Sequence, residues 1–216
     1  MLGQSITKNS LVLGLFALIT AGIVAATFQG TKERITLEEK RAAEKALLEI
    51  IPASRHDNDM LTSVITVPSD HLSQLGLNDA AEIYVALMGD SPVAVIIPTV
   101  APDGYSGDIK LIVGINTDGN VAGVRVLSHH ETPGLGDKIE IRKSKWIQGF
   151  EGKSLEEPAL EKWRVKKDGG EFDQFTGATI TPRAVVSAVK NTLEYFNRNR
   201  DHLLKEIKRT QGQREQ

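Results

Sequence analysis

Residues 109–127 read IKLIVGI-NTDGN-VAGVRVL, two β-branched apolar runs on either side of a polar turn. β-Branched residues favour strands, and the Asp118-Gly119 pair favours a tight reversal of the chain. This stretch therefore predicts a β-hairpin. Three more runs of the same kind, each bounded by Gly, Pro or Asp, predict strands at residues 64–67, 82–87 and 93–97.

The second half of the chain predicts helices. One helical stretch is expected near Lys138–Phe150, and a strand-like piece is expected around Trp163–Val165, with the tryptophans of both segments in the core. A long helix should begin at Pro182, because Thr181 suits the N-cap position and proline suits the first helical position. Its core face is given by residues at helical spacing: Val185, Ala188, Val189, Leu193 and Phe196. The polar tail after Lys208 is expected to fray. The fold class is therefore α+β, an antiparallel sheet with packed helices.

The N-terminal segment predicts a membrane anchor. Residues 11–28 are uncharged and almost entirely apolar, and they lie between Lys8 and Lys32. A transmembrane helix needs about 20 such residues. The alternative is a signal peptide cleaved after Val24-Ala25-Ala26, but the apolar run is long for a signal peptide. The anchor is assigned to a first region, residues 1–30.

A second region, residues 31–52, predicts a juxtamembrane helix. Thr36 and Glu39 have the spacing of a capping box, and Pro52 should stop the helix. One face is apolar and is expected to contact a core, through Leu37, Ala43, Ala46, Leu47, Ile50 and Ile51. A third region, residues 53–216, is expected to form the folded domain.

Composition excludes several classes of function. The 216 residues carry a net charge of −2 and no cysteine. The absence of cysteine excludes disulfides, thiol catalysis and cysteine-ligated iron–sulfur clusters. The balanced charge, without a basic stripe, gives no indication of nucleic-acid binding. An electron carrier built from this chain would need an organic cofactor or a haem, and the Cys-x-x-Cys-His motif for haem attachment is absent.

A threonine-rich turn precedes the last helix: Thr176-Gly177-Ala178-Thr179-Ile180-Thr181. The helix start offers N–H groups and the positive end of a dipole, and its first turn carries Arg183 but no acid. These features favour an external anion, in particular a phosphate. Taken alone, the same turn also fits a plain loop and helix cap.

Two further loops stand out. Glu131-Thr132-Pro133-Gly134-Leu135-Gly136 is a Pro/Gly turn where backbone can approach a flat ligand, and Gly104-Tyr105-Ser106-Gly107-Asp108-Ile109 lies upstream. The first loop follows His129-His130, which suggests a metal site. Adjacent residues at a strand end point to opposite faces, so no metal site is expected there.

The three segments, taken in chain order as residues 104–109, 131–136 and 176–181, resemble the FMN-binding domain family over about residues 99–197. With the anchor, the chain resembles the G subunits of Rnf (Rsx) complexes and, more distantly, the C subunits of sodium-pumping NADH:quinone reductases. The resemblance implies that Thr179 carries FMN through a phosphodiester bond. It also implies that the cofactor-binding residues include Thr176, Gly177, Ala178, Thr181, Glu131, Thr132, Gly134, Leu135, Gly136, Tyr105 and Ser106. No base is evident beside Thr179, so a separate enzyme is expected to attach the flavin. The resemblance implies that this flavin transferase takes FMN from FAD and needs magnesium.

The resemblance further implies a role in electron transport. The chain would be a flavoprotein component of an ion-translocating membrane complex, with the other subunits as partners and no independent catalysis. The family places the domain on the periplasmic side of the bacterial inner membrane. A charge count disagrees, since more Lys and Arg follow the anchor than precede it, but large domains can translocate regardless of such charges. The alternative function is an anchored scaffold or binding module without a cofactor.

Overall fold

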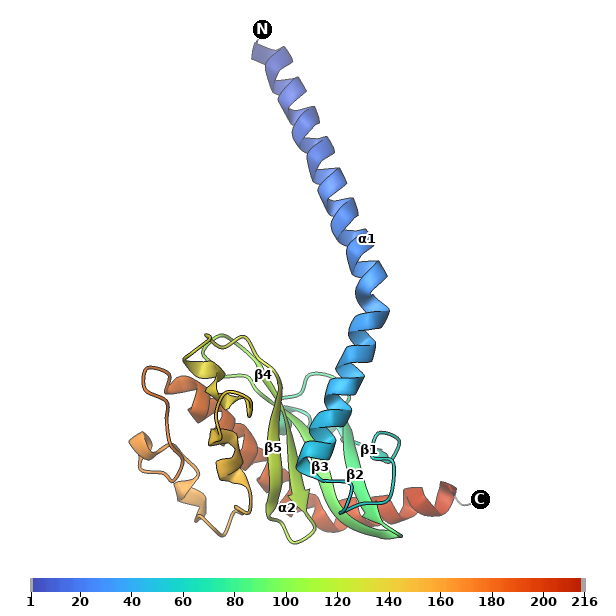
Figure 1. The fold of residues 1–216 in the computed structure, drawn as a ribbon, viewed down its shortest axis with the longest axis vertical. Coiled ribbons are helices and arrows are strands. Elements are labelled where there is room, and N and C mark those ends of the chain that lie inside the picture. Colours follow the sequence, from blue (N-terminus) through green and yellow to red (C-terminus); the bar gives the residue numbers. More distant parts are fainter. Residues whose placement is uncertain (1, 215–216) are drawn as a thin grey trace. The chain divides into compact units, whose positions relative to one another are not determined.

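The computed structural model describes residues 2–214; within its helices, the side chains at 2–5, 33, 35–40, 42, 213 and 214 lie outside the description. The chain divides into two compact units, residues 1–43 and 44–216. The first unit is purely helical, and the second contains the sheet (Figure 1). Helix α1 (Leu2–Ile50) contributes its last turns to the second unit.

Five strands form one antiparallel sheet, as the sequence predicts, and their order in the sheet is β1-β2-β3-β4-β5. Their bounds are Val64–Thr66 for β1, Glu82–Met88 for β2, Ser91–Ala101 for β3, Ile109–Asn116 for β4 and Val121–Ser128 for β5. Each predicted apolar run is a strand. The predicted hairpin is confirmed, and the Gly119 N–H donates to the Asn116 carbonyl at 2.9 Å in its turn.

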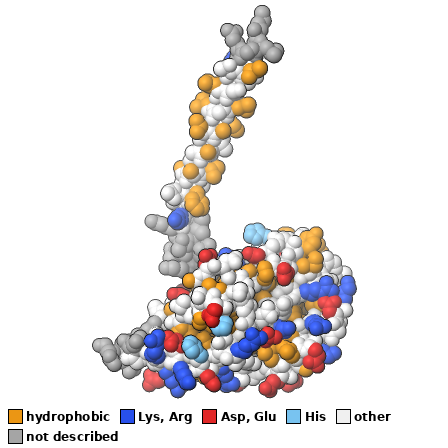
Figure 2. All heavy atoms as spheres, turned by 180° about the vertical axis from the view of Figure 1, so that it is seen from behind, with side chains coloured by type: hydrophobic (Ala, Val, Ile, Leu, Met, Phe, Trp, Pro, Cys, Tyr) orange, Lys and Arg blue, Asp and Glu red, His pale blue; other side chains and the backbone are white. Residues whose placement is uncertain are grey.

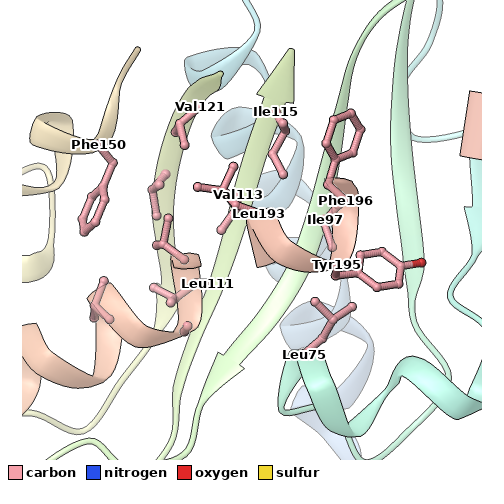
Figure 3. Packing of buried hydrophobic residues seen from close by; sticks show 14 of the residues in the cluster. Leu75, Ile97, Leu111, Val113, Ile115, Val121, Phe150, Leu193, Tyr195 and Phe196 are labelled. Carbon is pink, nitrogen blue, oxygen red and sulfur yellow. The ribbon is translucent and has the colours of Figure 1, made fainter. Parts of the chain in front are cut away.

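Both faces of the sheet are covered. Helix α2 (Ile180–Arg214) packs on one face, where Leu193 and Phe196 lie against the strands (Figure 3). All five residues of the predicted apolar face of α2 are buried. Strand residues alternate between the two sides, since Ile97 packs in the α2 cluster and Ile96 in a second cluster with Leu47 of α1. Burial on both faces explains why the strands are apolar at nearly every position.

The C-terminal turn of α1 is held on the second face by a glycine in β4. A Cβ at Gly114 would lie 2.2 Å from the Ile50 Cγ2 atom, so only glycine leaves room for this contact. The buried Arg125 of β5 donates to the Glu49 carboxylate at 3.0 Å and to the Glu49 carbonyl at 3.1 Å. A cation at this position also stabilises the C-terminal end of the helix dipole.

The N-terminal helix differs from the prediction in one respect. The backbone is helical without interruption from Leu2 to Ile50, so no new helix begins at Thr36, although the side chains of that expected capping box lie outside the description. Within the described residues, Ile6–Lys32 is the one stretch long and apolar enough to cross a membrane. Figure 2 shows orange hydrophobic side chains along this part of the helix, whereas the second unit presents many charged side chains.

The segment after β5 also differs from the prediction. Instead of one helix at 138–150, two short 3₁₀ helices form, η3 (Gly136–Ile139) and η4 (Trp146–Phe150). The backbone N–H of Trp146 donates to the Ser144 hydroxyl at 3.0 Å, and this local hydrogen bond competes with continuation of the helix. The remaining 3₁₀ helices are Ser69–His71, Ser73–Leu75, Leu160–Lys162 and Lys166–Asp168. Where a strand-like piece was expected, Val165 makes an isolated bridge with Phe172.

Aromatic rings support the loop that leads to α2. The Trp146 ring packs edge-on against Phe150 and Phe175, with centroids 5.3 and 5.1 Å apart. Phe150 in turn stacks on Phe172 at 4.6 Å. Trp163 is buried in the same core, as predicted, whereas Trp146 is partly exposed. The start of the threonine-rich turn is therefore fixed by packing at Phe175.

Candidate functional site

The three segments singled out in the sequence meet at one end of the sheet. Ala101 pairs with Ile109, and Lys110 pairs with Ser128, so the loop between β3 and β4 and the chain leaving β5 lie at the same end. Together with the start of α2 they enclose a cavity of about 390 Å³. It is lined by Tyr105, Glu131, Thr132, Leu135, Gly136, Gly177, Ala178, Thr179, Ile180 and Thr181.

The threonine-rich turn places Thr179 at the start of α2. Gly177 has a φ of 81°, and the Ala178 N–H donates to the Phe175 carbonyl at 3.1 Å, which closes the turn. The helix begins at Ile180, and the Thr179 carbonyl accepts from the Arg183 N–H at 3.3 Å. Thr179 is therefore the N-cap residue, and the prediction that Thr181 has this role is wrong. The helix also runs to Arg214, beyond the expected fraying point.

Glu131 is the polar centre of the site. Its side chain is only 4% exposed. One carboxylate oxygen accepts from the Ser106 N–H at 2.9 Å, and the other accepts a short hydrogen bond from the Thr181 hydroxyl. A single carboxylate thus connects the β3–β4 loop, its own loop and the first turn of α2.

The Glu131–Gly136 loop requires glycine at two positions for different reasons. Gly134 has a φ of 79°, and its N–H donates to the Asp137 carboxylate at 2.8 Å. Gly136 is buried, and an added Cβ would lie 2.7 Å from Glu131 Oε2 and 2.8 Å from Thr181 Oγ1. The requirement at Gly136 is therefore set by protein groups, whereas the sequence reasoning attributed it to close approach of a ligand.

Behind the site, His129 is oriented by two hydrogen bonds that the sequence did not indicate. Its Nδ1 accepts from the Glu131 N–H at 3.0 Å, which assigns the proton to Nε2, and Nε2 lies 3.0 Å from the Glu140 carboxylate. Burial alone would raise the pKa of Glu140. The hydrogen bonds from His129 and Arg142 outweigh burial, so this pKa lies below its usual value. His129 therefore stabilises the backbone at Glu131 through its hydrogen bond to the Glu131 N–H.

Arg183 is already paired, whereas the sequence reasoning left it available for an external anion. Its Nε and Nη2 atoms donate to the two carboxylate oxygens of Asp168 at 2.6 and 2.7 Å. These hydrogen bonds lower the pKa of Asp168 and raise that of Arg183. Because this guanidinium is engaged, the helix start itself offers its N–H groups and dipole to an anion.

Not every predicted site residue lines the cavity. Thr176 and Gly134 are exposed and do not line the cavity, and Ser106 contributes through its N–H to Glu131. The cavity adds Ile180, which the sequence reasoning did not name. His130 is exposed while His129 turns to Glu140, and among the residues whose side chains the structure describes, no group of three His, Asp or Glu is arranged to hold a metal ion.

The cavity suits a flat, partly apolar ligand with an anionic group. Its volume lies within the roughly 300–1,000 Å³ range of small-molecule and cofactor pockets. Leu135 and Ile180 are 42% and 45% exposed, and Tyr105 is 68% exposed, so apolar surface is available to a ring system. The hydroxyl of Thr179 and the N–H groups at the start of α2 offer polar contacts to an anionic group. The residues present therefore fit a phosphorylated flavin.

Comparisons with known proteins agree with this geometry. Residues 104–194 match the family model described as FMN-binding domain, and residues 1–50 match the one described as RnfG N-terminal region. A protein of Shewanella loihica, named as the G subunit of an ion-translocating oxidoreductase complex, is 51% identical over 93% of this chain and 94% of its own length. Proteins of the same name from Vibrio vulnificus and Pseudomonas aeruginosa are 52% and 51% identical; each alignment covers 93% of this chain, and 94% and 93% of the respective relatives.

Proposed function

Because the chain belongs to the family of G subunits of ion-translocating oxidoreductase complexes and contains an FMN-binding domain, we propose that it carries FMN covalently on Thr179 and relays electrons within such a complex. The observation that carries the proposal is the position of Thr179. It is the N-cap residue of α2, and it lines a cavity shared by all three motif segments. A phosphate ester at this hydroxyl would lie at the positive end of the helix dipole.

The chain's own residues bind and shield the cofactor. Leu135, Ile180 and Tyr105 provide apolar surface for the ring system, and Gly177 and Ala178 leave the turn unobstructed around Thr179. A bound FMN supplies the redox chemistry by accepting and donating electrons. The protein supplies the position of this group and the surface that contacts it.

Attachment of FMN is assigned to a separate flavin transferase. A threonine hydroxyl is a weak nucleophile without a base, and the nearby carboxylate of Glu131 is already engaged by Ser106 and Thr181. The transferase would therefore provide the base and use FAD as donor. The other partners are the remaining subunits of the complex, as the names of the relatives indicate.

The membrane topology is part of the proposal. The span Ile6–Lys32 agrees with a single-pass protein, and the domain is assigned to the periplasmic side of a bacterial inner membrane. Covalent attachment suits that side, where a dissociated cofactor would be lost. An alkaline phosphatase fused to the C-terminus should be active, and activity of a cytoplasmic reporter fused at the same point would reverse the assignment.

The attachment site is tested by intact mass and peptide mapping. The full chain is produced together with a flavin transferase, and the wild type should gain the mass of one FMN and give a fluorescent band in denaturing electrophoresis. Thr179→Ala should lose both signals, whereas Thr176→Ala, at an exposed position outside the cavity, should keep them. Covalent FMN on the Thr179→Ala protein would refute the assignment. A wild type without any mass gain would favour a scaffold module.

A further inference from the structure

We propose that Glu131 is a positioning residue that determines which hydroxyl of the threonine-rich turn receives the flavin. This inference rests on the proposed function of Thr179. The turn and the first helical residues contain three hydroxyls, at Thr176, Thr179 and Thr181, and two of them line the same cavity. Side-chain chemistry does not distinguish these threonines, so the surrounding structure must do so.

The carboxylate of Glu131 connects parts of the chain that are distant in sequence. Its two oxygens accept from the Ser106 N–H, 25 residues upstream, and from the Thr181 hydroxyl, 50 residues downstream. Two glycines leave the space for this side chain, since a Cβ at Gly136 would lie 2.7 Å from Oε2 and a Cβ at Gly104 would lie 3.0 Å from Oε1. Glu131, Ser106 and Thr181 are hereafter called the clasp.

The clasp makes the two cavity threonines unequal. Thr181 is 0% exposed, and its hydroxyl proton is donated to the carboxylate. Thr179, two residues earlier, is partly exposed and belongs to the wall of the open cavity. A transferase can therefore approach the hydroxyl of Thr179, whereas that of Thr181 is buried and engaged.

The selected reaction is a phosphoryl transfer with FAD as donor. The threonine oxygen forms a new bond to the phosphorus on the FMN side, the pyrophosphate P–O bond breaks, AMP leaves, and the hydroxyl proton passes to a base of the transferase. No electrons are exchanged in this step. The clasp contributes by holding the turn so that one hydroxyl faces the donor and the other does not.

The experiment compares an isosteric variant with a truncated one in the full chain. In Glu131→Gln the amide oxygen can still accept from Ser106, and the amide NH₂ can donate to the Thr181 oxygen. In Glu131→Ala both partners lose their acceptor and become unsatisfied. We expect the initial rate of FMN attachment at Thr179, with purified transferase and FAD, to fall about tenfold or more in Glu131→Ala and to stay within about threefold in Glu131→Gln.

Peptide mapping adds a readout that loss of stability alone would not change. The Thr179→Ala protein should take up no FMN at Thr181, whereas Thr179→Ala combined with Glu131→Ala should acquire some there, because the hydroxyl is released. In the apoprotein, hydrogen exchange at the Ser106 amide should accelerate in Glu131→Ala and remain slow in Glu131→Gln.

A second pair of variants covers the case in which Glu131→Ala does not fold. Thr181→Val keeps the shape of the side chain but removes the donated proton, and Thr181→Ser restores it. Attachment at Thr179 should be slow in the valine variant and largely recovered in the serine variant. Equal rates in these two variants, or equal losses in Glu131→Gln and Glu131→Ala, would overturn the inference. A wild type that takes up no FMN would instead count against the proposed function.

Discussion

Replacing Gly136 with alanine tests how closely Glu131 and Thr181 pack against this position. The added Cβ would lie 2.7 Å from Glu131 Oε2, 2.8 Å from Thr181 Oγ1 and 2.9 Å from Glu131 Cβ, whereas a real Cβ atom essentially never has such a neighbour within 3.0 Å. The first two of these atoms are terminal atoms of side chains, but both side chains are buried and hydrogen-bonded to each other. The methyl group must therefore push Glu131 and Thr181 apart.

The cost of this change follows from two effects. Overpacking a buried site costs about 1–3 kcal/mol, and loss of a hydrogen bond to a charged group costs about 1.5–3 kcal/mol. One displacement causes both effects, so they do not add fully, and we expect about 2–3 kcal/mol in the free energy of unfolding. For a protein of this size each kcal/mol lowers Tm by about 2–4 °C, which predicts a fall of about 4–12 °C.

The assay is thermal unfolding of the full chain in detergent, followed by circular dichroism in the absence of flavin. Gly149→Ala is the matched control, because that glycine is exposed and its added Cβ would meet nothing within 4 Å. Its stability should remain within about 0.5 kcal/mol of the wild type. The Gly136→Ala protein should also take up FMN more slowly. Identical melting of the two variants would show that the loop relaxes freely and that the glycine has no packing role.

Three other predictions concern the fold and its anchor. Gly114→Ala should lower Tm because its Cβ would lie 2.2 Å from Ile50, whereas Gly123→Ala should not, because its Cβ would lie 3.4 Å from Ile50. Scanning fluorimetry measures both Tm values, and equal values would contradict this prediction. The pKa of Glu140 is lower in the folded state, so its stabilising effect is present above the ordinary value of 4.5 and is lost as pH falls through the folded pKa. The stability difference between the wild type and Glu140→Gln should therefore shrink on acidification below that value. The protein should stay in membranes after carbonate washing with residues 6–32 still attached, and recovery of a shortened soluble form would indicate a cleaved signal peptide.

The strands were predictable because their β-branched runs are bounded by clear turn residues. The helix boundaries were less predictable, for physical reasons that are local. Residues 31–43 contain no proline or glycine and many good helix formers, so nothing stops α1 before the apparent capping box at Thr36. In residues 138–150 one helix was expected, but the Ser144 hydroxyl accepts a backbone N–H and two short 3₁₀ helices form instead.

The composition of the site could be predicted, but its hydrogen bonding could not. The three loops were recognisable as short sequences, and each contributes to the same end of the sheet. The partners of Glu131 are 25 and 50 residues away, and the carboxylates that pair with His129 and Arg183 are 11 and 15 residues away. Such pairings depend on the sheet register, which places Lys110 opposite Ser128, and no local pattern encodes them.

The pairing of Arg183 leads to a final prediction about how an anion at Thr179 is stabilised. Both carboxylate oxygens of Asp168 hold the guanidinium, and the described hydrogen bonds of Glu131 use Ser106 and Thr181 rather than backbone N–H groups of the helix start. The positive end of α2 is thus available to an external anion, and the N–H groups and dipole of the peptide backbone stabilise that anion. Because the Arg183–Asp168 pair is exposed, its loss should cost little. Arg183→Gln should therefore attach FMN within about threefold of the wild-type rate, since exposed pairs contribute little. A loss as large as that in Glu131→Ala would instead show that Arg183 leaves Asp168 to bind the phosphate.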